Sequence, residues 1–372
     1  MKLLTILGAR PQFIKAATVS RAIAQHNLNQ SDNPIQEVIV HTGQHFDANM
    51  SDVFFEQLDI PRPNYSLGIS SLSHGAMTGR MLEAIEKLLC PEKPDCVLVY
   101  GDTNSTLAGA LAASKLHIPV AHVEAGLRSH NLSMPEEVNR VLTDRVSDYL
   151  FCPTQTAVAN LKSEGFPFLT ALRTEQQITD VGDVMYDATL FYRERARNTV
   201  QLSRFGVTEN NYALCTMHRQ ENTDDPKKLT NILDALGKIA DVICPVLLPL
   251  HPRTRKKIDL LGARHYLQRI EVLEPLGYLD MQRLQMDAKM ILTDSGGVQK
   301  EAAFHKVPCV TLRNETEWPE TVAMGWNVLA GSNTSSIVRA AQQARATKTC
   351  EPDCYGDGHA AERILTCLSA KH

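Results

Sequence analysis

The sequence has no surplus of basic residues. Its 38 lysines and arginines are set against 42 aspartates and glutamates, which gives a net charge of -4. A protein that holds a nucleic-acid backbone or an anionic lipid surface needs a cationic face for the phosphates. The composition therefore argues against nucleic acid and membranes as partners.

Long hydrophobic runs and grouped cysteines are also scarce. The run that opens the chain ends at Gly8, which is too short for a signal-peptide core or a membrane-spanning helix, so we expect a cytoplasmic protein. The nine cysteines are odd in number and lie mostly in apolar runs, as reduced thiols do. Cys350 and Cys354 are close, but no second pair or histidine stands at zinc-ligand spacing, so we expect no metal site.

Short apolar runs alternate with helix-like segments along the whole chain. This alternation is typical of parallel sheets covered by helices on both faces, and 372 residues are enough for two such domains. The sequence therefore predicts an α/β protein with two doubly wound, Rossmann-like domains. The predicted strands are 3–7, 37–42, 96–100, 119–123 and 149–152 in the first domain, and 212–217, 242–250, 270–274, 290–293, 308–312 and 327–331 in the second.

The segment 163–183 interrupts this pattern with glycine, proline and polar residues. We place the crossing between the domains near residue 175. The first domain is then 1–175 and the second 176–359, and a last helix over 360–372 packs back on the first domain.

Polar residues follow the predicted strands of the first domain. Ligands of open parallel sheets bind outside the carboxyl ends of the strands. Arg10 and Lys15 follow the first strand, Asp102 follows the third, and Glu124 follows the fourth, with Glu137 at the next helix start. Asp102 could be only a helix N-cap, and Arg10 and Lys15 only solvated cations. Glu124 is harder to explain by structure alone, because strand alternation points its side chain into the crevice.

In the second domain a strand runs into Ser295, Gly296 and Gly297 and then into a helix. Backbone N–H groups without a Cβ can approach a diphosphate there, and the helix dipole favours its negative charge. Glu301, one turn into the helix, can accept hydrogen bonds from both hydroxyls of a ribose. The alternative is a plain tight turn.

Two histidines also follow strands of the second domain, His218 after the first and His251 after the second. A histidine at a strand end is often a structural one, so neither is assigned a role by position alone. The basic residues after His251 are better explained as a solvated helix face.

Taken in order, these motifs resemble those of the non-hydrolysing UDP-N-acetylglucosamine 2-epimerases. The resemblance covers nearly the whole chain and implies the two-Rossmann glycosyltransferase-B fold, an active site in the interdomain cleft and a homodimer. The motifs that carry it are GARP, GDTNST, HVEAGLR, MPEEVNR, HRQEN, DSGGVQKEA and Thr316-Glu317.

The resemblance also implies roles for single residues. Gln44 falls in a region that helps bind a second, regulatory sugar nucleotide in bacterial members, and His251 is a possible sugar or regulatory contact. The remaining assignments are phosphate-binding cations at Arg10 and Lys15, essential carboxylates at Asp102, Glu124 and Glu137, an essential histidine at His218, the phosphate loop at Ser295, Gly296 and Gly297, and a ribose-binding Glu301.

Departures from the family pattern indicate a branch. Many members read GTRPE and TERPE where this chain has Gln12 and Trp318, and the altered motifs look closest to enzymes acting on UDP-2,3-diacetamido-2,3-dideoxy-glucuronic acid for bacterial surface polysaccharides. UDP-N-acetylglucosamine is the alternative substrate. Trp318 in place of arginine puts the regulatory site in doubt. The cations available for a uronic acid carboxylate are Arg80, Arg128, His130 and Arg313.

The implied reaction explains the carboxylates. The C2 proton of a 2-acetamido sugar becomes acidic as UDP leaves C1, so elimination to a 2-acetamidoglycal and re-addition of UDP invert C2. Asp102, Glu124 and Glu137 are the candidates for removing and returning the proton, and which does which stays open. C2 is never oxidised, so no nicotinamide is needed, and no Gly-x-Gly-x-x-Gly follows the first strand.

Domain closure should keep the glycal and UDP from water, so we expect a mobile hinge near residue 175. Two rival functions share parts of this pattern. A retaining glycosyltransferase would use the Ser-Gly-Gly loop and Glu301 but needs an acceptor site. A non-catalytic sugar-nucleotide sensor would have no use for three carboxylates.

Overall fold

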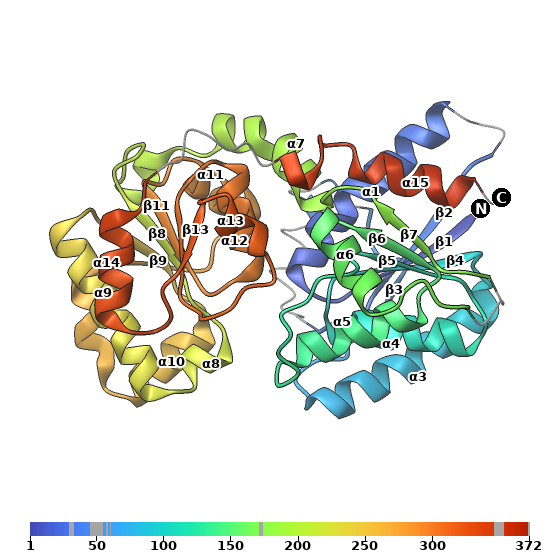
Figure 1. Ribbon diagram of the computed structural model, residues 1–372, viewed down its shortest axis with the longest axis horizontal. Coiled ribbons are helices and arrows are strands. Elements are labelled where there is room, and N and C mark those ends of the chain that lie inside the picture. Colours follow the sequence, from blue (N-terminus) through green and yellow to red (C-terminus); the bar gives the residue numbers. More distant parts are fainter. Residues whose placement is uncertain are drawn as a thin grey trace. The chain divides into compact units, whose positions relative to one another are not determined.

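The computed structural model describes residues 1–29, 33–44, 55–56, 59, 61–170, 174–345 and 353–370. The chain divides into two compact units, Met1–Ala188 with Asp353–His372, and Thr189–Pro352 (Figure 1). Cys350 and the last two residues of the predicted C-terminal helix lie outside the described residues.

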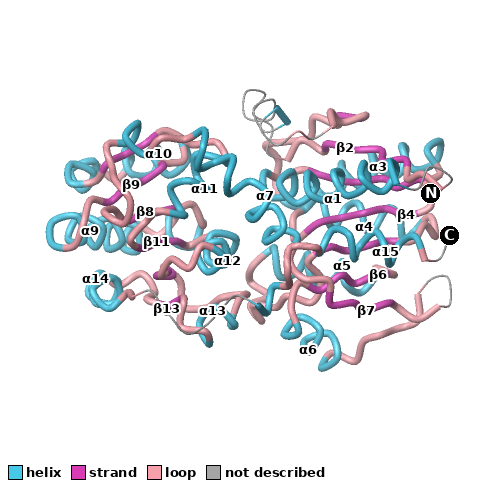
Figure 2. Tube along the Cα trace, turned by 90° about the horizontal axis from the view of Figure 1, so that it is seen from above, coloured by secondary structure: helices cyan, strands magenta, loops and turns pink. Residues whose placement is uncertain are grey.

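The first unit is built on a parallel sheet in the order β3-β2-β1-β4-β5-β6-β7. Figure 2 shows β2, β4, β6 and β7 in that order across the sheet. The strands are β1 (Lys2–Leu7), β2 (Gln36–His41), β3 (Tyr65–Ser66), β4 (Cys96–Tyr100), β5 (Val120–Val123), β6 (Tyr149–Cys152) and β7 (Gln177–Asp180).

Helices cover both faces of this sheet, as the doubly wound pattern predicts. Alternate residues of the strands, such as Leu4 and Ile6, pack with Met81 and Ile85 of α3 and with the alanines of α4. On the other face α1 packs against α15 (Figure 1). The helices are α1 (Arg10–Asn29), α3 (His74–Glu92), α4 (Asn104–Lys115), α5 (Pro135–Val146), α6 (Gln155–Ser163), α7 (Val184–Thr199) and α15 (Ala360–Ser369).

The first unit extends past the predicted crossing at residue 175. Strand β7 pairs in parallel with β6, so residues 177–180 complete the first sheet. The chain passes to the second unit only after Ala188, inside α7, and returns at Asp353 instead of residue 360. Strand β7 was not predicted from the sequence, because its residues, QITD, form a short polar edge strand that stays partly exposed.

The second unit carries a parallel sheet in the order β10-β9-β8-β11-β12-β13. One face packs on α9 and α14, and the other on α11 and α12 (Figure 1). The strands are β8 (Ala213–Thr216), β9 (Val246–Pro249), β10 (Glu271–Leu273), β11 (Met290–Thr293), β12 (Cys309–Thr311) and β13 (Asn327–Leu329).

The helices of the second unit include several short ones that follow strand ends. Two 3-10 turns lie at Leu202–Phe205 and Ala263–Arg269, and a third, at Asp353–Tyr355, belongs to the first unit. The α-helices are α8 (Gln220–Thr223), α9 (Pro226–Val242), α10 (Pro252–Leu260), α11 (Tyr278–Met286), α12 (Gly296–Phe304), α13 (Pro319–Ala323) and α14 (Thr334–Gln343). Within the described ranges, no helix combines the length and the apolarity that crossing a membrane requires.

A buried carboxyl group joins the end of the first unit to its C-terminal helix. Asp187 of α7 accepts a hydrogen bond of 2.9 Å from the backbone N–H of Ala361, at the start of α15. Burial raises the pKa of Asp187 to about 6, although the N–H groups of Ala361 and Ala360 oppose the shift. This carboxyl therefore binds its proton more tightly in the folded chain than in the unfolded one.

We expect Asp187 to make the free energy of unfolding fall as pH rises from about 4 to about 6. Its folded pKa lies above its unfolded value, so the stabilisation is complete at low pH and is lost as pH rises through the folded pKa. A shift of this size corresponds to about 2 to 3 kcal/mol. The free energy of unfolding of Asp187→Asn, measured in urea, should therefore rise by about 2 kcal/mol relative to that of the native chain when the pH is raised from 4 to 7. A difference between the two proteins that does not change with pH would contradict this.

Candidate active site

Lys15 and Glu124 form a buried ion pair at the carboxyl edge of the first sheet. Lys15 comes from the second turn of α1 and Glu124 directly follows β5, and their side chains are 7% and 10% exposed. The ammonium predicted to bind phosphate thus lies against a carboxylate, and a phosphate contact by Lys15 stays a prediction. Arg10, the first residue of α1, is partly exposed at the same edge.

The backbone after β5 turns sharply to bring Glu124 to this position. Glu124 has φ = +75°, in the left-handed region, which costs a residue with a side chain ~1–2 kcal/mol. The backbone N–H groups of Glu124 and Ala125 both donate to the Phe151 carbonyl oxygen at 3.0 Å, which holds the turn. A Cβ on Gly101 would lie 3.1 Å from Glu124 Oε2 and 3.3 Å from Lys15 Nζ, so glycine permits the close approach of the next loop.

Arg140 of α5 connects the other two predicted carboxylates. One guanidinium nitrogen donates to Asp102 Oδ2 and the other to Glu137 Oε2, each at 2.6 Å. The Asp102 side chain is 30% exposed and follows β4. The interpretation of Asp102 as only an N-cap is wrong, because Thr103 is the N-cap of α4 and forms a capping box with Thr106.

Glu137 is buried and accepts several hydrogen bonds. Its oxygens accept from the backbone N–H of Ser129 at 3.0 and 3.1 Å, from that of His130 at 2.8 Å, and from Arg140. Burial alone would raise the pKa of Glu137, but the Ser129 N–H and the Arg140 charge outweigh it and hold the pKa below its ordinary value. Glu137 therefore fixes the 129–130 loop as an ionised carboxylate.

Gln12 connects two loops at the same edge of the sheet, a role that sequence reasoning missed. Its Oε1 accepts from the backbone N–H groups of Gly8 and Ala9, both at 2.8 Å. Its Nε2 donates to the Tyr100 carbonyl oxygen at 2.7 Å and to Thr103 Oγ1 at 3.0 Å. An amide can both accept and donate in this way, which gives a physical reason for glutamine where many family members have glutamate.

Gln44 also makes contacts within the first unit. Its Oε1 accepts from the backbone N–H of Ser105 at 3.2 Å and from Ser105 Oγ at 2.8 Å. This places Gln44 at the start of α4, close to the loop that carries Asp102. A contact with a second sugar nucleotide stays a prediction.

The four cations considered for a uronic acid carboxylate differ in their surroundings. Arg128 is buried and bonded to Asp144 at 2.7 Å, and Arg313 of the second unit is buried and pairs with Glu317 at 3.1 Å. Both are therefore engaged in ion pairs inside their own units. Arg80 and His130 are exposed.

In the second unit a buried aspartate organises the loop that carries His218. Asp294 follows β11 and accepts from the backbone N–H of His218 at 3.1 Å, from that of Arg219 at 3.0 Å and from Asn222 Nδ2 at 3.3 Å. The imidazole of His218 is 48% exposed, with Nδ1 3.7 Å from Asp294 Oδ1. The neighbouring strands β8 and β11 thus present the histidine at the edge where the Ser-Gly-Gly loop begins.

The Ser-Gly-Gly loop opens helix α12 as predicted. Ser295 is the N-cap residue, and the helix starts at Gly296 and continues through Gly297. A Cβ on Gly296 would lie 3.2 Å from Glu317 Oε2, so a larger residue would press on the buried Glu317. The start of this nine-residue helix points N–H groups outward, which suits an anion.

Glu301 lies one turn into α12 and is almost buried. Its Oε2 accepts a hydrogen bond of 2.7 Å from Gln285 Nε2 of α11. This contact fixes the carboxylate in one orientation, as a residue that binds two neighbouring hydroxyls requires. The ribose contact itself stays a prediction.

His251 is the N-cap of α10, and its protonation follows from that role. Its Nδ1 accepts from the backbone N–H of Arg253 at 3.2 Å, so the proton of the neutral ring is on Nε2. Burial lowers the pKa of His251, and the neighbouring His218 and Arg253 lower it further. His251 is therefore a neutral hydrogen-bond donor near His218.

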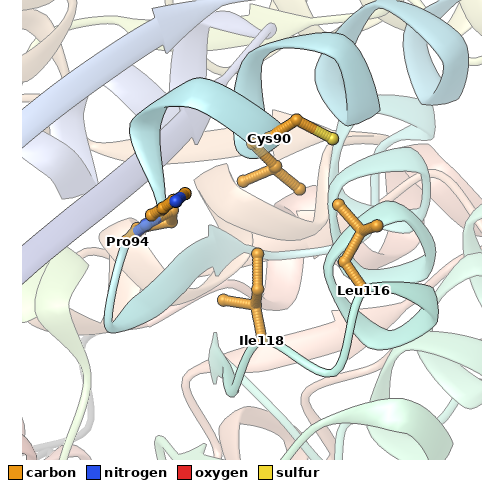
Figure 3. Close-up of a pocket in the computed structure, with 6 residues that line it drawn as sticks. Cys90, Pro94, Leu116 and Ile118 are labelled. Atoms are coloured by element: carbon orange, nitrogen blue, oxygen red, sulfur yellow. The ribbon is translucent and has the colours of Figure 1, made fainter.

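An apolar hollow of about 280 Å³ opens at the opposite edge of the first sheet, between the ends of α3 and α4 (Figure 3). It lies at the amino ends of β4 and β5 and so is not part of the carboxyl-edge constellation. Its lining residues are Leu89, Cys90, Lys93, Pro94, Leu116 and Ile118. Across the described part of the chain, no group of three or more histidine, cysteine or acidic side chains could hold a metal ion.

Arg140 and Asp144, which sequence reasoning missed, share a helical pattern with the predicted Glu137. Glu137, Arg140 and Asp144 lie three and four positions apart on α5, so they occupy one face of the helix, and all three are buried. A helix that places charged residues on its inner face binds partners elsewhere in the fold. Asp294, by contrast, lies in the predicted DSGG motif, but nothing in the sequence pattern indicated that its side chain holds the His218 loop.

Each of the two units is doubly wound around a parallel sheet. The first has carboxylates at the carboxyl edge of its sheet, and the second has a helix start that suits an anion. Together these features define a two-Rossmann α/β enzyme. A family profile described as UDP-N-acetylglucosamine 2-epimerase matches residues 27–369. The chain therefore belongs to the UDP-N-acetylglucosamine 2-epimerase family, whose members are isomerases. The predicted family and fold class are confirmed.

Similar proteins agree over the full length. The chain is 54% identical over 371 residues, 99% of both chains, to the UDP-2,3-diacetamido-2,3-dideoxy-D-glucuronate 2-epimerase of Pseudomonas aeruginosa. The Methanocaldococcus jannaschii UDP-GlcNAc 2-epimerase, solved with UDP-GlcNAc and UDP, covers all of both chains with 44% identity and a TM-score of 0.90. The Neisseria meningitidis UDP-GlcNAc 2-epimerase bound to UDP-GlcNAc also covers all of both, with 32% identity and a TM-score of 0.84.

Proposed function

We propose that the protein inverts C2 of UDP-2,3-diacetamido-2,3-dideoxy-glucuronic acid and so forms the manno epimer. The observation that supports this choice of substrate is the 54% identity, over 99% of both chains, with the UDP-2,3-diacetamido-2,3-dideoxy-D-glucuronate 2-epimerase of Pseudomonas aeruginosa. UDP-N-acetylglucosamine is the second candidate, because the solved relatives at 44% and 32% identity are named for it.

The proposed reaction passes through a 2-acetamidoglycal. UDP leaves C1 with its bonding electrons while a base takes the C2 proton from the opposite face, which forms the C1–C2 double bond. A proton then returns to the other face of C2, and UDP adds back at C1. Preorganised N–H groups at the start of α12, together with His218, would stabilise the charge on the departing diphosphate.

The contacts within the first unit support different roles for the three candidate carboxylates. Glu137 already accepts from two backbone N–H groups and Arg140, so we assign it to holding the loop and Arg140 in place. We assign two groups to the two faces of C2. They are Glu124, which pairs with Lys15, and the partly exposed Asp102, which pairs with Arg140. One of these two groups removes the C2 proton, and the other returns a proton to the opposite face.

We further propose that the reaction needs neither a nicotinamide nor a metal ion, since C2 keeps its oxidation state throughout. Turnover should then survive dialysis against a chelator. We also propose that the protein is a cytoplasmic homodimer and acts in the synthesis of a surface polysaccharide. Light scattering on the purified protein measures the oligomeric state.

Proton exchange in D2O tests the proposed function. Incubated with the diacetamido-glucuronic acid nucleotide alone, the protein should place deuterium at C2 and form the manno epimer, both visible by NMR. A retaining glycosyltransferase would require an acceptor and leave the C2 hydrogen in place. If UDP-N-acetylglucosamine turns over with the higher kcat/KM, the substrate assignment is wrong but the reaction stands. Absence of exchange with both nucleotides would remove the epimerase proposal.

A further inference from the structure

A chain of buried charges lies behind the carboxyl edge of the first sheet. His122, the third residue of β5, contacts Asp144 of α5, with 2.7 Å between Nδ1 and Oδ1, and both side chains are fully buried. Asp144 Oδ2 accepts from Arg128 at 2.7 Å, and Arg128 also forms two hydrogen bonds with Glu164, at 2.7 and 2.9 Å. None of these residues belongs to the groups assigned above to proton transfer or UDP binding.

The hydrogen bonds fix the orientation of the His122 ring. Nε2 lies 2.7 Å from the Gly101 carbonyl oxygen, which can only accept, so Nε2 carries a proton. Nδ1 lies 2.7 Å from Asp144 Oδ1. Burial alone would raise the pKa of Asp144, but its hydrogen bond with His122 and the Arg128 charge hold the pKa below its ordinary value. The ring therefore links the Gly101 carbonyl to the Asp144 carboxyl group.

The two partners hold the backbone on either side of the proposed proton-handling groups. His122 holds the carbonyl of Gly101, the residue before Asp102, and Asp144 accepts from the backbone N–H of Gly126 at 3.1 Å, two residues after Glu124. Both turns need left-handed backbone, with φ = +63° at Gly101 and +79° at Gly126. Glycine adopts these conformations without steric cost and has no side chain to hold them, so the contacts of His122 and Asp144 restrict where the two turns lie.

We propose that His122 and Asp144 are positioning residues for the epimerisation, because these two side chains, in contact with each other, fix both the loop that carries Asp102 and the turn that carries Glu124. The proposal rests on the proposed function for its kinetic consequence. Neither residue touches the substrate. They act by keeping two carboxylates on different strands at a constant separation, which proton transfer to opposite faces of one carbon requires.

His122→Gln tests this role. Glutamine can donate to the Gly101 carbonyl or to Asp144, but its own oxygen must then face the other oxygen atom, so one of the two links is lost. We expect kcat to fall about 10- to 100-fold, because misplacement of reacting groups by ~1 Å has effects of this order. Deuterium entry at C2 should fall in parallel. The Kd for UDP, measured by calorimetry, should stay within about twofold, since the Ser-Gly-Gly loop, His218 and Glu301, which are the proposed UDP groups of the second unit, are unchanged.

His359→Gln is the matched control, because its side chain is exposed in the same unit. It should leave kcat unchanged. A kcat for His122→Gln within threefold of the native value would overturn the proposal, as would a parallel loss of UDP affinity. If His122→Gln does not fold, Arg128→Lys tests the proposal instead. Lysine cannot form the hydrogen bonds that Arg128 makes with both Asp144 and Glu164. A kcat at least threefold lower with unchanged UDP affinity would then support the proposal, and an unchanged kcat would overturn it.

Nitrogen-15 NMR of the native protein tests the His122 hydrogen bonds independently of catalysis. His122 Nε2 should give the shift of a protonated nitrogen, because it faces the Gly101 carbonyl oxygen. An unprotonated Nε2 would contradict this hydrogen bond and overturn the proposal. If the native protein shows a protonated Nε2 but no exchange at C2 of any nucleotide, the proposed function has failed and the buried His122–Asp144 contact has not.

Discussion

Glu124→Gln should lower kcat at least about 10³-fold and leave the Kd for UDP within about twofold. General acid–base groups contribute ~10²–10⁴-fold to rates. Glutamine has nearly the same shape and can still accept a hydrogen bond from Lys15, but it cannot take the C2 proton. The charge is lost while the left-handed turn and its two N–H contacts to Phe151 remain. Stopped assays of epimer formation and deuterium entry at C2 measure the effect.

Glu136→Gln is the control for this prediction. It makes the same chemical change at the start of α5, beside Glu137 and away from the strand end. Glu136 is partly exposed, and its replacement leaves Glu137 and Arg140 unchanged, so kcat should stay within about twofold of the native value. A Glu124→Gln enzyme with substantial activity would show that another group removes or returns the proton.

Arg313→Met should lower the free energy of unfolding by about 3–5 kcal/mol, the usual effect of removing one partner of a buried ion pair. The Arg313 and Glu317 side chains are 1% and 2% exposed, and one guanidinium nitrogen lies 3.1 and 3.2 Å from the two carboxylate oxygens. Without the arginine, the buried Glu317 loses this ion pair beside Gly296. Unfolding in urea, followed for the second unit, measures the loss.

A double-mutant cycle separates this structural role from the predicted substrate contact. Arg313→Met combined with Glu317→Met removes both charges and should recover most of the lost stability, because a buried pair replaced by apolar side chains is often neutral. Arg269→Met removes an exposed pair with Asp241 and should change stability by less than about 1 kcal/mol. If Arg313→Met instead raises KM and leaves unfolding unchanged, the arginine acts mainly on the substrate.

The strands were predictable because apolar runs are local. The bounds 96–100, 149–152 and 290–293 match β4, β6 and β11 residue for residue, since each run is flanked by polar or turn-forming residues. Strand β7 was not predictable, because a polar edge strand carries no apolar run. Its place in the sheet depends on pairing with β6 and not on burial of its own side chains.

The candidate site was predictable by position and not by partners. Strand ends placed Asp102 and Glu124 at one edge of the sheet, and the structure has both there. The partners come from distant sequence, since Arg140 lies 38 residues from Asp102 and Lys15 lies 109 from Glu124. Such pairings need the three-dimensional fold, because only the strand order brings α1 and α5 to the same edge.

Helix α5 limits how this enzyme can change in evolution. Its inner face holds the 129–130 loop through Glu137, Asp102 through Arg140, and the turn after Glu124 through Asp144. Each residue in an α-helix turns by ~100°, so deleting one residue within α5 would disconnect at least one of these contacts and rotate the others away. Insertions and deletions should therefore collect in the loops outside α5. Within α5, a new substrate preference should arise only by substitution.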